Sequence, residues 1–196
     1  MGTGQTMLTI LAMLLMGRLI LMVNENNANM GEAVKMSEYR ITATSLATSY
    51  LEDATGKEFD EKTLPPYDPP TVTATSCTAP SALGPDAGEV YPNFDDFDDF
   101  NGLDRLDTLR DMTGKIITAI YHVRGNVQYV KISGGAIVPE TTTPTYTKRF
   151  TVTITSASML TDNFSYSLAP KSGQPLPTNI QDTLVYSVMF SYWRLR

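Results

Sequence analysis

Residues 7–23 read MLTILAMLLMGRLILMV, seventeen positions that are almost all aliphatic but include one permanent cation, Arg18. As a helix this stretch is about 25 Å long, at the short end of what crosses a bilayer. A single membrane span is therefore one interpretation, with Arg18 reaching toward Asn24 at the polar boundary. A secretory signal peptide fits less well, because MGTGQT lacks a basic residue and NENNANM is a poor cleavage site.

The helical character continues to residue 54 without a proline. Within ATSLATSYLEDA the apolar residues are three or four positions apart, which predicts one apolar stripe on an amphipathic helix. The stripe consists of Ala43, Leu46, Ala47, Tyr50, Leu51 and Ala54. Gly56 stands where a left-handed C-cap is expected, so the helix should end near Thr55. We expect bends or local unwinding at Gly17 and Gly31.

Residues 6–55 therefore form one predicted rod of about 75 Å. Its first half is apolar all round and needs either lipid or copies of itself as neighbours. In a bundle of identical chains, a copy displaced by about 10.5 Å would bring Glu25 level with Arg18, with Glu32 as the competing partner. The predicted subunit interface consists of Met7, Leu8, Leu11, Leu14, Leu15, Arg18, Leu19, Met22 and Glu25.

The middle of the chain reads as irregular. Residues 64–92 contain seven prolines among many threonines and serines, which excludes a regular helix or a central strand. We interpret this part as a flexible loop or, more consistent with the helix beneath, an ordered covering layer. Its composition suits O-linked sugars, for which the candidates are Thr71, Thr73 and Thr75. Asn163 lies in a weak N-glycosylation sequon.

An acidic, aromatic segment follows, NFDDFDDFNGLDRLD. Phe94, Phe97 and Phe100 recur every third residue, with pairs of aspartates between them. One interpretation is a calcium site, because hard cations prefer several carboxylate oxygens. The weak calcium candidates are Asp96, Asp98, Asp99 and Asn101. The other, which we favour, is a compact turn whose phenylalanines pin the loop to a core while the acids stay solvated.

From Gly114 onward the apolar period changes to two, which predicts strands. GKIITAIYHVRG alternates, and Gly125-Asn126 then predicts a two-residue hairpin turn into VQYVKI. KRFTVTITS should expose its threonines and bury Phe150, Val152 and Ile154. The last strand, LVYSVMFSYWRLR, should place Leu184, Tyr186, Val188, Phe190 and Tyr192 on one side.

Four such strands predict an antiparallel sheet whose apolar face is covered by the amphipathic half of the helix. The expected fold is α+β. Its expected parts are the helix over residues 1–56, a connecting loop region over 57–113 and a sheet domain over 114–196.

The amino-acid composition excludes some classes of function and disfavours others. The chain has 196 residues, 42% of them hydrophobic, and a net charge of −6, which argues against nucleic acid or anionic headgroups as main partners. The single cysteine, Cys77, excludes an intrachain disulfide and a thiolate metal cluster. The single histidine, His122, has no recognisable catalytic partners in the sequence. We therefore expect no enzyme and no cofactor.

The order of these elements resembles a type IV pilin. Gly4-Gln5-Thr6 is similar to the prepilin leader boundary, and ATSLATSYLEDATGKEFDE to the second half of the pilin helix. DDFDDFNGL resembles the loop before the sheet, and TYTKRFTVTITS and VMFSYWRLR resemble sheet strands. The likeness of architecture covers nearly the whole chain. Where the family carries an early glutamate, this chain has Gln5 or Thr9, and we expect the Arg18–Glu25 pairing to take over that role.

The resemblance implies a subunit that is first inserted in a membrane and then polymerises through its apolar helix into an extracellular filament on the cell surface. It implies a homopolymer assembled by inner-membrane, ATP-driven machinery. A pseudopilin or minor pilin of a secretion or DNA-uptake system is an alternative from the same superfamily. A single-span, membrane-anchored binding domain is the alternative from another class.

Overall fold

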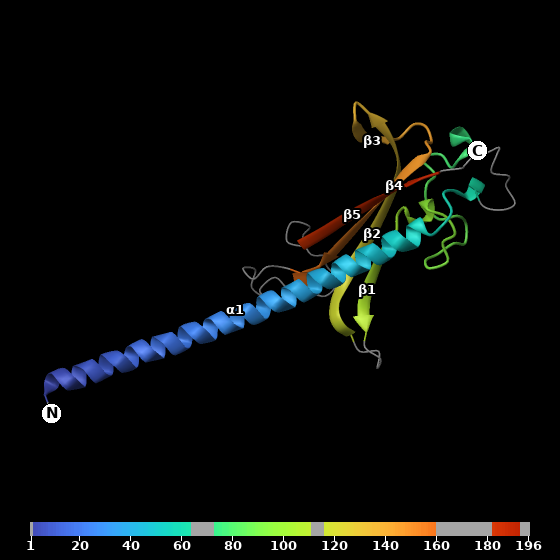
Figure 1. Ribbon diagram of the computed structural model, residues 1–196. Coiled ribbons are helices and arrows are strands. Elements are labelled where there is room, and N and C mark those ends of the chain that lie inside the picture. The colour runs from blue at the N-terminus through green and yellow to red at the C-terminus, as the bar shows by residue number, and fades with distance from the viewer. Residues whose placement is uncertain (1, 64–72, 111–115, 160–181, 193–196) are drawn as a thin grey trace.

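One long helix and one antiparallel sheet are the main elements of the described residues, an α+β fold as predicted (Figure 1). The computed structural model describes residues 2–63, 73–110, 116–159 and 182–192. Helix α1 extends over Thr3–Thr55, 53 residues, or about 80 Å at helical rise. Figure 1 shows its second half lying against the sheet and its first half projecting away from it.

The apolar stripe of α1 faces the sheet, as predicted. Ala43, Ala47, Tyr50 and Ala54 are buried, and Leu46 and Leu51 pack against the same core. The helix runs through Gly17 and Gly31 without interruption, so the unwinding expected there is wrong. The left-handed cap is also wrong: Gly56 has φ −80° and ψ −9°. Its N–H instead donates to the carbonyls of Glu52 and Asp53, which closes the last turn within right-handed geometry.

The sheet contains five strands. They are β1 (Asp104–Arg110), β2 (Ile116–Ser133), β3 (Ala136–Glu140), β4 (Thr147–Ser156) and β5 (Asp182–Ser191). The order is β1-β2-β4-β5, and β3 pairs with the end of β2. Every pairing is antiparallel. β1 thus lies inside the segment that the sequence suggested as a connecting region.

Strict alternation of side chains gives β4 one buried and one outward face. Phe150, Val152 and Ile154 are fully buried, and the threonines between them are partly exposed, as predicted. Three of the predicted inward positions of β5 pack on the same core, namely Leu184, Val188 and Phe190. Tyr192, just after β5, packs on a second buried cluster that contains Phe59 and Tyr129, and Tyr186 is the exception. The Tyr186 hydroxyl instead lies 3.3 Å from the Thr44 hydroxyl of α1.

The hairpin turn predicted at Gly125-Asn126 is wrong, because β2 continues straight through it. Gly125 is needed for another reason: a Cβ there would lie 2.4 Å from the Phe100 carbonyl oxygen. Its N–H donates to the Leu103 carbonyl at 2.8 Å, and its own carbonyl accepts from Gly102 at 3.1 Å. Glycine therefore marks the place where another backbone approaches the strand.

The turn that the sequence reading missed is Gly134–Gly135, between β2 and β3. Ser133 pairs with Ala136, so the loop has two residues. Both glycines have positive φ, 59° and 82°, as a two-residue hairpin that follows the sheet twist requires.

Short 3₁₀ turns lie in the segments that connect the helix and the strands. These are η1 (Glu61–Thr63), η3 (Ala74–Ser76), η4 (Asp98–Phe100) and η5 (Ala157–Met159). Phe94, Phe97 and Phe100 are buried, so the predicted pinning of the loop to the core is confirmed. The Phe97 N–H donates to the Glu58 carbonyl at 2.8 Å, which joins this loop to the chain just after the helix.

Candidate assembly interface and buried charge cluster

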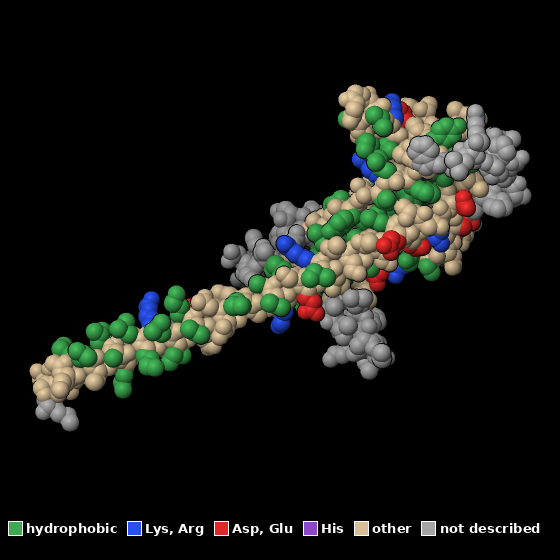
Figure 2. All heavy atoms as spheres, in the orientation of Figure 1, with side chains coloured by type: hydrophobic (Ala, Val, Ile, Leu, Met, Phe, Trp, Pro, Cys, Tyr) green, Lys and Arg blue, Asp and Glu red, His purple; other side chains and the backbone are tan. Residues whose placement is uncertain are grey.

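The projecting part of α1 buries nothing in the described structure. Every residue from Gly2 to Lys35 is exposed. We call residues 2–35 the shaft and the rest of the described chain the head. Figure 2 shows hydrophobic side chains along most of the shaft, with basic side chains standing out from it. By length and composition alone, α1 contains a segment that could cross a membrane.

All of the predicted interface residues lie on this shaft. The apolar ones have exposed fractions between 59% and 75%, namely Met7, Leu8, Leu11, Leu14, Leu15, Leu19 and Met22. Arg18 and Glu25 are exposed as well. The predicted interface residues therefore lie on one exposed helical segment, and no side chain of the head covers them.

Arg18, Glu25 and Glu32 form a row along the shaft. They stand seven residues apart, and a straight helix drifts only about 20° per seven residues, so they share one face. Two copies shifted along the axis by one such step would bring arginine and glutamate to the same height. The spacing thus offers a register between parallel copies.

The shaft continues into the head as one unbroken helix. The second half of this helix is held on the sheet by hydrogen bonds as well as by apolar packing. The Tyr50 hydroxyl donates to Asp107 Oδ2 of β1 at 3.0 Å. The Tyr121 hydroxyl of β2 donates to the Tyr39 carbonyl at 3.1 Å. Burial raises the pKa of Tyr50, so it stays a donor.

The four calcium candidates are engaged with groups of the chain itself. Asp96 Oδ1 accepts the N–H groups of Asp98 and Asp99, and Asp99 Oδ2 accepts those of Asp95 and Asp96. The Asn101 amide donates to the Leu83 carbonyl and accepts from the Val127 N–H. These side chains tie the loop to itself and to β2.

A second group of carboxylates includes Asp95, which is exposed, Glu89, which is half-buried, and Asp99, which is buried. Oxygens of Glu89, Asp95 and Asp99 lie within 4.8 Å of one another. Only Asp99 is shared with the calcium candidates. Burial raises the pKa of both Glu89 and Asp99.

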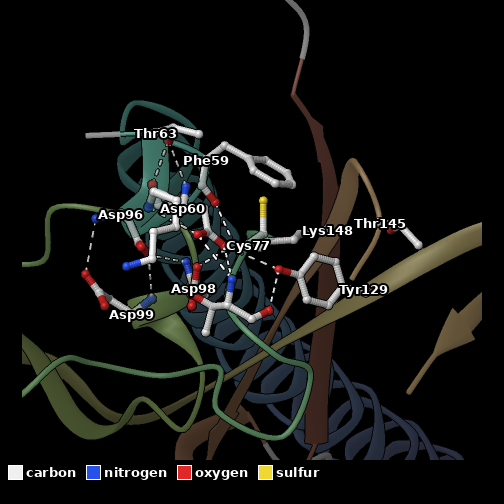
Figure 3. Close-up of polar contacts among 12 residues, drawn as sticks. Phe59, Asp60, Thr63, Cys77, Asp96, Asp98, Asp99, Tyr129, Thr145 and Lys148 are labelled. Atoms are coloured by element: carbon white, nitrogen blue, oxygen red, sulfur yellow. Dashed lines mark hydrogen bonds and ion pairs between the residues drawn. The ribbon is translucent and has the colours of Figure 1, made fainter. Parts of the chain in front are cut away.

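The acids of the loop are not all solvated, and here the sequence-based expectation is wrong. Asp96, Asp98 and Asp99 are only 2–3% exposed. Lys148, whose side chain is fully buried, reaches Asp98 from the start of β4 (Figure 3), and Asp96 and Asp99 accept backbone N–H groups of the loop. We call Lys148, Asp60 and Asp98 the buried charge cluster.

Each of the three N–H groups of the Lys148 ammonium has an acceptor. Nζ lies 2.8 Å from Asp60 Oδ2, donates to the Phe59 carbonyl at 2.7 Å and forms an ion pair with Asp98 Oδ1. The ring of Phe59 lies 4.5 Å from Nζ, and that of Tyr129 lies 5.3 Å away. Aromatic rings therefore enclose a fully paired cation.

Asp60 is held by other donors besides the lysine. The Thr78 N–H donates to it at 3.0 Å, the Lys62 N–H at 3.2 Å and the Tyr129 hydroxyl at 3.3 Å. The Tyr129 hydroxyl also lies 2.8 Å from the Thr78 carbonyl. The cluster thus joins the chain after α1, the proline-rich segment, η4 and the sheet.

Several carboxyl groups are buried close together in this region, and their burial and mutual repulsion raise their pKa values. Burial raises the pKa of Asp98, although the Lys148 ammonium opposes the shift. Burial, with the charges of Asp98 and Asp99, raises the pKa of Asp96 to about 9. Burial also raises the pKa of the nearby Cys77 thiol to about 11, which keeps it protonated and unreactive.

The remaining candidates take ordinary positions. His122 Nε2 lies 2.6 Å from Asp104 Oδ1 across the β1–β2 pair, and the aspartate side chain is largely exposed. Thr73 and Thr75 are exposed, as glycan acceptors need to be. Thr71 and Asn163 lie outside the described residues.

The chain matches no protein-family model, and comparisons with curated proteins and with solved structures return no match. The case for a function therefore depends on the geometry above.

Proposed function

We propose that this chain is the structural subunit of an extracellular, type IV pilus-like filament that polymerises through the shaft. The observation that carries the proposal is the complete exposure of an apolar helical segment that continues directly into a well-packed head. The resemblance of the sequence to type IV pilins supports the same proposal.

The energy of the exposed side chains favours association. Burying one leucine, isoleucine or methionine side chain contributes about 1.5–3 kcal/mol. Thirteen large apolar side chains between Met7 and Val23 are more than half exposed. Their burial in a bundle of parallel copies would contribute on the order of tens of kcal/mol per subunit before the entropy of ordering is subtracted.

The same segment is suited to lipid before assembly. Its length and composition match a single membrane span. Insertion stores each subunit in the membrane, and transfer into the filament replaces lipid contacts by contacts with other shafts. Membrane-bound, ATP-driven machinery is the proposed partner in that transfer. In the polymer, the head lies outside the apolar bundle because its own core is already filled.

Electron microscopy of negatively stained cells that express the chain, with mass spectrometry of sheared material, tests this proposal. We expect filaments whose main protein is this chain. A chain that lacks residues 1–23 should yield a folded head and no filament. Filaments formed by that shortened chain, or full-length chains that remain as single molecules in lipid under all conditions, would contradict the proposal.

One observation favours a second candidate, a membrane-anchored monomer, because a span of this length needs no polymer. Cross-linking in intact cells separates the two. The filament proposal predicts ladders of cross-linked shafts through cysteines placed at Leu15, and the anchor predicts monomers. A chain confined to the periplasm would favour a pseudopilin role within the same superfamily.

A further inference from the structure

We propose that the head seals itself with a covalent bond: Lys148 Nζ and Asp98 Cγ form an amide (an isopeptide bond), with Asp60 accepting the proton of the amine. This inference does not depend on the filament proposal.

The first argument is proximity without mobility. Nζ is in contact with Asp98 Oδ1 and is 2.8 Å from Asp60 Oδ2, and the three side chains are 0–3% exposed. Lys148 is held by a β-strand and Asp98 by the η4 turn, so neither group can move away easily. An amine fixed against a carboxyl group gains the rate advantage of an intramolecular reaction, which reaches several orders of magnitude.

The second argument is that the two carboxyl groups differ in their surroundings. Asp60 is fixed by the Thr78 and Lys62 N–H groups and by the Tyr129 hydroxyl, and its Oδ2 faces Nζ. It is therefore the group placed to take a proton from the amine. Burial raises the pKa of Asp98 against the opposing charge of Lys148, and a proton on this carboxyl group gives the form that an amine attacks.

The third argument is the exclusion of water. Phe59 and Tyr129 flank the amine, and both are at most 2% exposed. A dry site disfavours the charged pair relative to the neutral amide, and it also protects the finished amide from hydrolysis.

The step balances without any external reactant. The ammonium of Lys148 transfers one proton to the carboxylate of Asp60, which leaves a neutral amine. The nitrogen lone pair attacks Cγ of the protonated Asp98, and the tetrahedral intermediate expels water as the C–N bond replaces the C–OH bond. The products are one amide, one water molecule and protonated Asp60, and no group is oxidised or reduced.

The pair of Lys131 and Glu140, in which the carboxylate is largely buried and the amine is exposed, is a natural control. Lys131 Nζ contacts Glu140 Oε2, but the lysine side chain is 53% exposed and no second carboxylate contacts its amine in the described structure. This pair should remain ionic. Both sites have an amine in contact with a carboxylate. Only the buried charge cluster also shields the amine from water and places a second acid beside it.

Intact mass spectrometry of the full-length protein under denaturing conditions tests the bond. We expect a deficit of about 18 Da, one water, in the wild type and in Lys131→Arg, and no deficit in Lys148→Arg. Comparison among these three proteins cancels any other modification they share. A wild-type mass without the deficit overturns the proposal, and this measurement needs no variant to fold.

Peptide mapping then tests the assignment. Trypsin should leave the Lys148–Arg149 bond uncut, and the peptide that contains Lys148 should be joined to the one that contains Asp98. A link to the peptide that contains Asp60 overturns the choice of acceptor. Asp60→Asn should lose the deficit while Asp98 and Lys148 remain, and a folded Asp60→Asn protein that keeps the deficit overturns the role of Asp60 as proton acceptor.

Discussion

The two halves of α1 are one helix with opposite relations to the rest of the chain. In the head half, four residues are buried against the sheet and two tyrosine hydroxyls join helix to strands. In the shaft no residue is buried and the head supplies no contact. The head half therefore contributes to folding of the subunit, and the shaft is left exposed for the contacts between subunits that we propose. Substitutions in matched pairs test this division.

The largest expected effects come from one carboxylate placed in each half. Ala47→Asp puts a charge where the side chain is fully buried and should unfold the head, which thermal melting by circular dichroism would record. Leu15→Asp should leave that melting temperature unchanged and abolish filaments in electron micrographs. Ser81→Asp, in an exposed loop, is the control for added charge. Filaments of normal yield from Leu15→Asp would contradict the division.

Loss of the Lys148 side chain should be nearly as damaging to the head. Lys148→Met removes the proposed amide and leaves the buried carboxyl groups of Asp60 and Asp98 without their partner, and loss of one member of a buried pair costs about 3–5 kcal/mol. Urea denaturation of the purified chain measures this loss. Lys35→Met, on the exposed shaft, should change the free energy of unfolding of the head by less than about 0.5 kcal/mol. Equal effects of the two substitutions would show that burial is not the cause.

The register of the shaft is tested by charge reversal. Arg18→Glu should place like charges at one height in the proposed polymer and lower the temperature at which filaments dissociate. The double variant Arg18→Glu, Glu25→Arg should restore it. The melting of the head should stay the same in all three proteins. Arg18→Ala filaments with unchanged yield and thermal stability would remove the pairing from the account.

Two glycines sharpen the comparison at smaller scale. Gly125→Ala forces a methyl group to within 2.4 Å of a backbone oxygen and should destabilise the head by about 1–3 kcal/mol. Gly31→Ala meets nothing within 4 Å and should stabilise the helix by about 0.5–1 kcal/mol. Chemical denaturation and the helical signal in circular dichroism report the two effects. A neutral Gly125→Ala would mean that the strand and the loop separate readily.

The smallest expected effect is on pH dependence. The pKa of Asp96 is raised from 3.8 to about 9, so the folded head binds a proton that the unfolded chain has released between these values. Stability should therefore fall as the pH rises from about 4 to about 9. The Glu140 pKa is lowered to about 2 by its hydrogen bond with Lys131, and it acts in the opposite sense only below about pH 4.5. In Asp96→Asn the melting temperature of the head, measured at a series of pH values, should depend less on pH than in the wild type.

Local patterns were sufficient to predict the main elements. The period of 3.6 in residues 43–54 and the period of two in β4 each follow from one segment facing one core, and both are as the structure has them. The predicted interface residues are exposed on the shaft, and their role in assembly stays a prediction.

Two of the misses, at Gly125-Asn126 and at the acidic loop, involve partners far away in the chain. Gly125-Asn126 has the local chemistry of a turn, but Gly125 is fixed by the backbone of residues 100–103. Lys148 stands in phase with the buried Phe150 and Val152, a signal present in the sequence. Its meaning required acids 50 and 88 positions away, which no local pattern connects to it.

The unbroken passage of α1 from shaft to head has a mechanical consequence. A pull on the shaft acts along the helix axis and reaches the helix–sheet contact as shear, since there is no interruption at Gly17 or Gly31 to absorb it. Tyr50, Tyr121 and the apolar stripe are then loaded together rather than one after another. In the proposed filament the subunit would therefore transmit tension as a rigid link, and the force at which it fails would be set by the cooperative rupture of that contact.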